Sequence, residues 1–154
     1  MILKTEEEGK DICHLEKLIC EVTGAEGALA VNNNAAAVIL CLNEFAKGKE
    51  VIVSRGELVE IGGSFRIPEI MKFAGSCLRE IGTTIRKYKE DYEKAVNENT
   101  SAIMKIHKSN YKVWDYRHRE KRFKRACRRK NILYIEDLGS GVLVDFSKYG
   151  IKKK

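Results

Sequence analysis

One aspartate near the end of the sequence could hold a cofactor through its carboxylate. Asp137 follows closely on the apolar run 132–135 and precedes the glycine-containing turn 139–141, which places it at the edge of a predicted sheet. Paired with a pyridinium, a carboxylate keeps the ring nitrogen protonated, so that the ring accepts carbanion electrons, as in pyridoxal phosphate. From local context alone, an aspartate that initiates a turn is the more common explanation.

Three consecutive asparagines, Asn32, Asn33 and Asn34, precede an apolar run that begins at Ala35. An asparagine oxygen accepts a hydrogen bond from a free amide of the first helical turn, and the positive end of a helix is a natural seat for a phosphate. Capping accounts for one asparagine but not for three. A simple cap and a phosphate site are therefore both open interpretations.

Two arginines and one histidine are further candidates. Arg55 and Arg66 flank a segment where a planar guanidinium could hold an oxyanion, although exposed salt bridges are the favoured interpretation. His107 ends a predicted strand and could stack on a cofactor, although a lone histidine there is more often structural. No serine-histidine-aspartate arrangement, paired-carboxylate motif, phosphate loop or metal-ligand spacing is recognisable.

Strands and helices alternate along the chain. Gly24 and Gly48 mark the ends of two predicted helices, and Pro68 suits the first turn of a third. The predicted helices are 12–22, 35–46, 68–74 and 91–96; the predicted strands are 28–31, 50–54, 78–81, 100–106 and 132–135; a loop is expected over 55–67. This order predicts one three-layer α/β/α domain with a mostly parallel sheet, whose ligands collect at the carboxyl ends of the strands.

Length and composition exclude several classes of protein. The chain has 154 residues, of which 44% are hydrophobic and 33% charged, so it is neither collagenous nor wholly disordered. Its apolar run 35–42 is far shorter than the ~20 residues of a membrane span, and its acidic start does not resemble a secretory signal. The five cysteines are widely spaced and odd in number, which predicts free thiols. We therefore expect a cytoplasmic protein.

The net charge of +7 is concentrated in one stretch. Between Lys112 and Lys130, ten lysines and arginines stand against two acidic residues, and the rest of the chain has a net charge of −1. Such a stretch fits the electrostatic pattern of nucleic-acid binders. A non-catalytic RNA-binding protein is therefore one functional hypothesis.

Five segments carry long motifs in one order. They are Val31–Val38, Val53–Pro68, Glu80–Thr84, His107–Tyr111 and Asp137–Asp145. Together they resemble the bacterial L-seryl-tRNA(Sec) selenium transferases, the selenocysteine synthases. The resemblance implies the fold-type-I pyridoxal-phosphate architecture and the exchange of the seryl hydroxyl on a tRNA for selenium from selenophosphate. It also implies that the full-length protein is a homo-oligomer. The alternative function is that of a related pyridoxal-phosphate lyase of the same superfamily.

The resemblance also assigns roles to the candidate residues. Asp137 would be the partner of the pyridinium nitrogen, and Arg55 would bind the selenium donor, with Arg66 as a second substrate-binding candidate. The residues expected to approach the cofactor phosphate are Asn33, Asn34 and Ala35, and those expected to line its ring are His107 and Asn110.

The sequence departs from the family in what it lacks. The Schiff-base lysine of the family lies in a Ser-Gly-Asp-Lys-Leu context that does not occur in these residues. The amino-terminal tRNA-binding domain and the carboxyl-terminal small domain of the family are missing too. We therefore expect residues 1–154 to be a partial cofactor-binding large domain that is inactive alone.

The basic stretch 112–130 is the second departure. Where the family has a Gly-Phe-Thr turn and an amphipathic helix, this chain has Trp114 followed by mostly basic residues. Permitted codons for 114–128, read one base later, encode Gly-Ile-Thr-Asp-Ile-Glu-Lys-Lys-Asp-Leu-Lys-Glu-Leu-Ala, a family-like turn and helix. Two compensating frame shifts are therefore one hypothesis for this stretch, and a genuine basic helix is the other.

Overall fold

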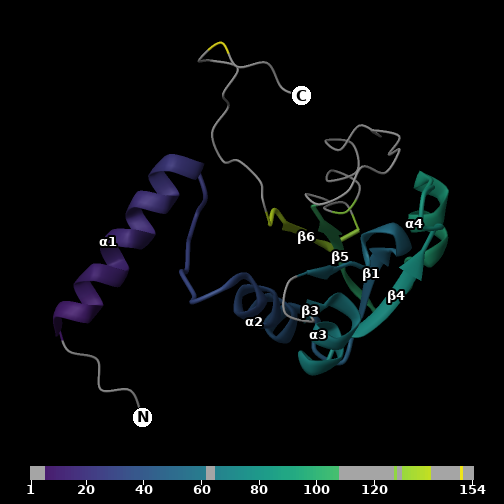
Figure 1. The fold of residues 1–154 in the computed structure, drawn as a ribbon, viewed down its shortest axis with the longest axis horizontal. Coiled ribbons are helices and arrows are strands. Elements are labelled where there is room, and N and C mark those ends of the chain that lie inside the picture. The colour runs from purple at the N-terminus through teal and green to yellow at the C-terminus, as the bar shows by residue number, and fades with distance from the viewer. Residues whose placement is uncertain (1–5, 62–64, 108–126, 128–129, 140–149, 151–154) are drawn as a thin grey trace. The chain divides into compact units, whose positions relative to one another are not determined.

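The computed structural model describes residues 6–61, 65–107, 127, 130–139 and 150 (Figure 1). The chain divides into two compact units, one of residues 1–32 with 141–154 and the other of residues 33–140. The basic stretch lies almost wholly outside the described residues, as do Asn110 and the segment 140–149. Among the described residues, no helix is long and apolar enough to cross a membrane.

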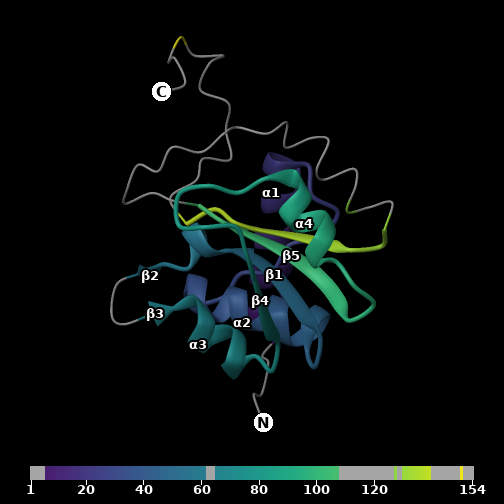
Figure 2. The ribbon, with the colours of Figure 1, turned by 90° about the vertical axis from the view of Figure 1, so that its right-hand side faces the viewer.

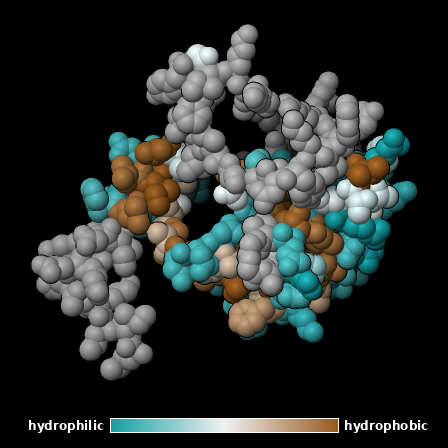
Figure 3. All heavy atoms as spheres, in the orientation of Figure 1, coloured by the Kyte–Doolittle hydropathy of each residue, from teal (hydrophilic) through white to brown (hydrophobic). Residues whose placement is uncertain are grey.

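The first unit contains one long helix, α1 (Glu6–Thr23). The helix ends as predicted at Gly24, whose φ of +72° is a left-handed conformation and whose amide donates to the carbonyl of Cys20. Leu15, Leu18 and Val22 are exposed on α1, and Figure 3 shows apolar surface over its carboxyl-terminal half.

The strand predicted over 28–31 does not form. These residues have no regular secondary structure, and Leu29 and Val31 are exposed. A short apolar run becomes a strand only where a neighbouring strand supplies backbone partners, and no strand of the described chain pairs with this run. The prediction was therefore wrong because it used local composition alone.

The second unit alternates helices and strands as predicted. Its elements are α2 (Asn34–Ala46), β1 (Glu50–Ser54), η1 (Arg55–Glu57), β2 (Glu60–Ile61), β3 (Phe65–Arg66), α3 (Ile67–Phe73), β4 (Cys77–Ile81), α4 (Lys89–Ala95), β5 (Thr100–Ile106) and β6 (Leu133–Asp137). The main sheet has the order β4-β1-β5-β6, and all of its pairs are parallel. The helices α2 and α3 cover one face and α4 the other, so the three-layer α/β/α prediction is confirmed (Figure 2).

The segment 55–67 is more ordered than the predicted loop. It contains η1 and a small antiparallel pair of strands, in which Glu60 lies opposite Arg66 and Ile61 opposite Phe65. The opposite charges of Glu60 and Arg66 at directly facing positions add a small stabilisation to this pair of strands. The sixth strand also extends beyond the predicted 132–135, so that Asp137 is its last residue.

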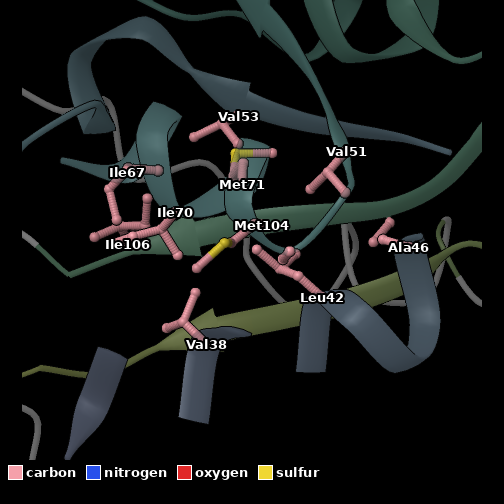
Figure 4. Packing of buried hydrophobic residues seen from close by; sticks show 12 residues of the cluster. Val38, Leu42, Ala46, Val51, Val53, Ile67, Ile70, Met71, Met104 and Ile106 are labelled. Carbon is pink, nitrogen blue, oxygen red and sulfur yellow. The ribbon is translucent and has the colours of Figure 1, made fainter. Parts of the chain in front are cut away.

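The two central strands are buried on both faces. Val51 and Val53 of β1 point to the α2–α3 layer, whereas Ile52 between them points to the α4 layer. Figure 4 shows the larger cluster, in which Leu42 of α2 and Met104 of β5 meet. Alternate side chains of a strand point to opposite faces, so a continuous apolar run is what a doubly covered strand requires.

All five cysteines are free, as the sequence predicts. Cys127 is buried in the cluster on the α4 side, and this burial raises the pKa of its thiol. The protonated thiol is therefore the favoured form in that layer.

We expect Leu42→Ala to lower the free energy of unfolding by about 2–5 kcal/mol, because it empties a fully buried position. Leu40→Ala, on the same helix but with Leu40 46% exposed, is the matched control and should cost less than about 1 kcal/mol. Urea denaturation followed by circular dichroism measures both. Equal losses for the two variants would contradict the assigned core.

Candidate functional site

The asparagine cap forms at the start of α2. Asn33 has extended backbone angles, φ −161° and ψ 167°, and its Oδ1 accepts from the Ala36 amide at 2.8 Å. Its carbonyl accepts from the Ala37 amide at 3.2 Å. In the described part of the chain, the first-turn amides of Asn34 and Ala35 have no such partner, so the helix retains two donors for a ligand.

Asp137 lies beside this helix start. Its side chain is only 6% exposed, and its Oδ1 accepts from Asn34 Nδ2 at 2.9 Å and from the Gly139 amide at 3.0 Å. Asn34 and Asp137 are 103 positions apart in the sequence. The sheet edge and the capped helix thus meet at one site, as the sequence analysis expects.

The second oxygen of the same carboxylate has a different environment. Asp137 Oδ2 is buried and accepts no hydrogen bond from the described residues. Leaving a buried charged acceptor unpaired is costly, which is why such atoms are usually satisfied by a protein group, a water or a ligand. The donor that suits it is a cationic N–H, so the site fits a pyridinium nitrogen.

His107 reaches the site through its backbone. Its amide donates to the carbonyl of Asp137 at 2.8 Å, which joins the ends of β5 and β6, and its side chain is exposed. The role of its side chain in lining a ligand stays a prediction. Asn110, the other ring-lining candidate, lies outside the described residues.

The two arginine candidates form exposed ion pairs. Arg55 Nε lies 3.0 Å from Glu80 Oε2, and Arg66 Nε lies 2.9 Å from Glu60 Oε2, with Glu69 at 3.5 Å from Arg66 Nη1. The hydrogen bond and charge of Glu60 are the main causes that raise the pKa of the Arg66 guanidinium. The structure therefore shows exposed salt bridges for both arginines. Arg66 lies in the small two-stranded sheet of β2 and β3 and not in the main sheet.

One buried acid was not singled out by the sequence analysis. Glu57 is 1% exposed, and its carboxylate is paired with Lys87. Like Asp137, Glu57 lies near the carboxyl end of a strand with an apolar run, three residues after the end of β1. Its burial, however, is visible only in the fold. Among the described residues, no three histidines, cysteines or acids group as metal ligands.

Comparison with known proteins identifies the family. The profile of the L-seryl-tRNA selenium transferases matches residues 1–154. The chain belongs to this family. It is 52% identical over 147 residues to the L-seryl-tRNA(Sec) selenium transferase of Caldanaerobacter subterraneus, covering 94% of this chain and 32% of the relative.

Other transferases of the family match similarly. The relative from Clostridium perfringens is 52% identical over 155 residues, covering 99% of this chain and 33% of that protein. The one from Desulfovibrio desulfuricans is 55% identical over 139 residues, covering 89% and 29%. The chain thus spans about a third of the length of the transferases that it matches.

Solved structures share the fold at low sequence identity. A D-glucosaminate-6-phosphate ammonia-lyase superposes with a TM-score of 0.73 at 19% identity, covering 87% of this chain and 40% of the lyase. An aminotransferase from Psychrobacter cryohalolentis gives a TM-score of 0.63 at 17% identity, covering 90% of this chain and 33% of the aminotransferase. This chain therefore has the fold of part of a fold-type-I large domain.

We expect Asn33→Ala to lower the free energy of unfolding by about 1 kcal/mol, because the Ala36 amide loses its acceptor. Asn33→Asp keeps an acceptor oxygen at the cap and should retain most of the stability. Asn32→Ala, which changes the exposed asparagine next in sequence, is the control and should be close to neutral. Thermal and urea unfolding compare the three, and a loss for Asn32→Ala equal to that for Asn33→Ala would argue against the cap.

Proposed function

We propose that this chain is part of the cofactor-binding large domain of an L-seryl-tRNA(Sec) selenium transferase. The cofactor is pyridoxal 5'-phosphate, and the reaction of the whole protein converts seryl-tRNA(Sec) to selenocysteyl-tRNA(Sec) with selenophosphate. The observation that carries the proposal is the buried Asp137 carboxylate, with one oxygen held and one unpaired beside a capped helix. The family match supplies the substrate class.

Asp137 is the residue that would bind the ring nitrogen. Hydrogen bonds from Asn34 and Gly139 hold Oδ1, so the carboxylate cannot rotate freely and Oδ2 is the oxygen available to a ring N–H. A charge-assisted hydrogen bond of this kind keeps the nitrogen protonated. When bound, the cofactor supplies an electron sink for a carbanion, and the carboxylate maintains that property.

The start of α2 would bind the cofactor phosphate. The amides of Asn34 and Ala35 and the positive end of the helix favour an anion, and Asn33 keeps this turn in shape through its cap. Asn34 would thus have two roles: its backbone amide would bind the phosphate, and its side chain orients the Asp137 carboxylate. His107 would line the ring from the end of β5, and Asn110 is proposed for the same role on the family resemblance.

The arginines are proposed for the anionic substrates. Arg55 lies at the carboxyl end of β1, and its ion pair with Glu80 is exposed, with half of the arginine side chain accessible. Exposed pairs contribute little stability, so an incoming anion can replace Glu80 at small cost. We assign the selenium donor to Arg55, and Arg66 remains a second candidate for substrate binding.

The alternative of a related lyase has weaker support. Its support is the fold shared with an ammonia-lyase at 19% identity, whereas relatives with 52% identity are named selenium transferases. The names of the same relatives support seryl-tRNA(Sec) as the substrate. A cytoplasmic homo-oligomer is proposed on the family resemblance alone. The RNA-binding hypothesis depends on the stretch 112–130, which lies almost wholly outside the described residues.

We expect Asp137→Asn to weaken non-covalent binding of pyridoxal phosphate about 10- to 150-fold, because a hydrogen bond to a charged acceptor is lost. Absorbance and fluorescence titrations of the chain measure the dissociation constant. Glu136→Gln removes the adjacent carboxylate, which faces Lys105 on β5, and is the matched control. Unchanged affinity in Asp137→Asn would contradict the cofactor site.

A chimera tests the transferase assignment. Residues 28–107 of this chain should replace the matching segment of the Clostridium perfringens relative and support selenocysteyl-tRNA(Sec) formation within about tenfold of the parent rate. Adding Asn34→Ala, which removes the side chain that donates to Asp137 in this chain, should lower the cofactor affinity and the rate of the chimera together. A chimera that folds and binds pyridoxal phosphate but transfers no selenium would contradict the assignment.

A further inference from the structure

We propose that Glu57 is a positioning residue, whose buried ion pair with Lys87 holds the end of β5 and thereby places His107 and Asp137. The structural part of this inference stands on contacts between described residues. Its consequence for the cofactor rests on the function proposed above. The starting observation is that Glu57 is the most deeply buried acid among the described residues, at 1% exposed, and has no part in the proposed chemistry.

The end of β5 needs an acceptor that β1 does not provide. The last register pair between the two strands is Val53 with Met104, after which β1 ends and the chain turns into η1. Ile106 lies two residues beyond that pair and would otherwise have an unpaired amide. Glu57 Oε2 accepts from this amide at 3.4 Å, so the side chain replaces the missing backbone partner.

The other side of the same strand end holds the candidate site. Successive amides of a strand point to opposite sides, and the next amide, that of His107, donates to the Asp137 carbonyl at 2.8 Å. Ile106 and Asp137 are also register partners. Glu57 and Asp137 therefore fix adjacent amides of one strand from its two sides.

Lys87 is held in place by the turn that follows β4. Gly82 has a φ of +67°, and a Cβ there would lie 2.8 Å from the Arg86 carbonyl oxygen, which accepts from the Thr83 amide at 2.7 Å. This tight turn delivers Lys87, whose side chain is 17% exposed, to the Glu57 carboxylate. Glu57 thus joins the segments after β1 and after β4 to the end of β5.

Removing one charge of a buried ion pair is costly because the opposite charge stays buried, whereas removing both charges avoids that cost. We expect Glu57→Gln to accelerate amide hydrogen exchange at Ile106 and His107 roughly 10- to 100-fold without cofactor, with Val51 and Ile52 amides unchanged. The double variant Glu57→Gln/Lys87→Met keeps an uncharged acceptor oxygen for the Ile106 amide and should recover most of the protection of Ile106 and His107 against hydrogen exchange. Nuclear magnetic resonance measures each amide separately.

Glu80→Gln is the matched control, since it removes a carboxylate from an exposed ion pair that also joins the segments after β1 and in β4. It should leave exchange at Ile106 and His107 unchanged. If Glu57→Gln does not fold, Lys87→Met replaces it in the same comparison with the double variant. Exchange at Ile106 and His107 within twofold of the wild-type rate in these single variants would overturn the proposal.

The cofactor readout separates this inference from the proposed function. We expect Glu57→Gln to weaken pyridoxal phosphate binding about tenfold and the double variant to restore it. If Asp137→Asn lowers cofactor affinity while Glu57→Gln does not, the cofactor site stands and the positioning role is overturned. If neither variant changes affinity although exchange accelerates as expected, the proposed cofactor site fails and the functional role of Glu57 fails with it.

Discussion

The hydrogen bond from Asn34 to Asp137 is the contact around which the site is organised. It joins the first turn of α2 to the last residue of β6, and it fixes one oxygen of a carboxylate that folding has removed from water. A buried carboxylate requires compensation, and the described residues provide it for Oδ1 alone. The remaining oxygen, Oδ2, is buried without a hydrogen-bond partner among the described residues, and this is the feature on which the proposed cofactor site rests.

The parallel sheet makes this contact possible. Because all four strands run in the same direction, their polar carboxyl ends gather at one edge, and α2 starts at that edge. Apolar side chains on both faces of β1 and β5 hold the strands between the two helical layers. Apolar residues thus form the interior of the sheet, and the polar residues of the candidate site lie at the carboxyl ends of its strands.

The ion pairs near the carboxyl ends of the strands are of two kinds, exposed and buried. Arg55 and Arg66 form exposed ion pairs with their carboxylate partners, and an exposed ion pair contributes little to stability. Glu57 and Lys87 are paired inside, where loss of either partner is costly, so this pair suits a permanent structural role. Ion pairs of the same residue types are thus exposed in one place and buried in the other.

The amino-acid sequence was sufficient to predict the features that depend on neighbours along the chain. The Asn33 cap, the helix that follows it and the strands over 50–54 and 100–106 were predictable, because capping and apolar periodicity act within a few residues. The family motifs predicted that Asn34 and Asp137 belong to one site. The predicted strand over 28–31 failed and the hairpin within 55–67 was missed, because pairing depends on partners that local composition does not reveal. Three features became visible in the folded chain alone: which oxygen of Asp137 has no partner among the described residues, which arginines are paired, and that Glu57 is buried. Each of them depends on groups that folding brings together from distant parts of the chain.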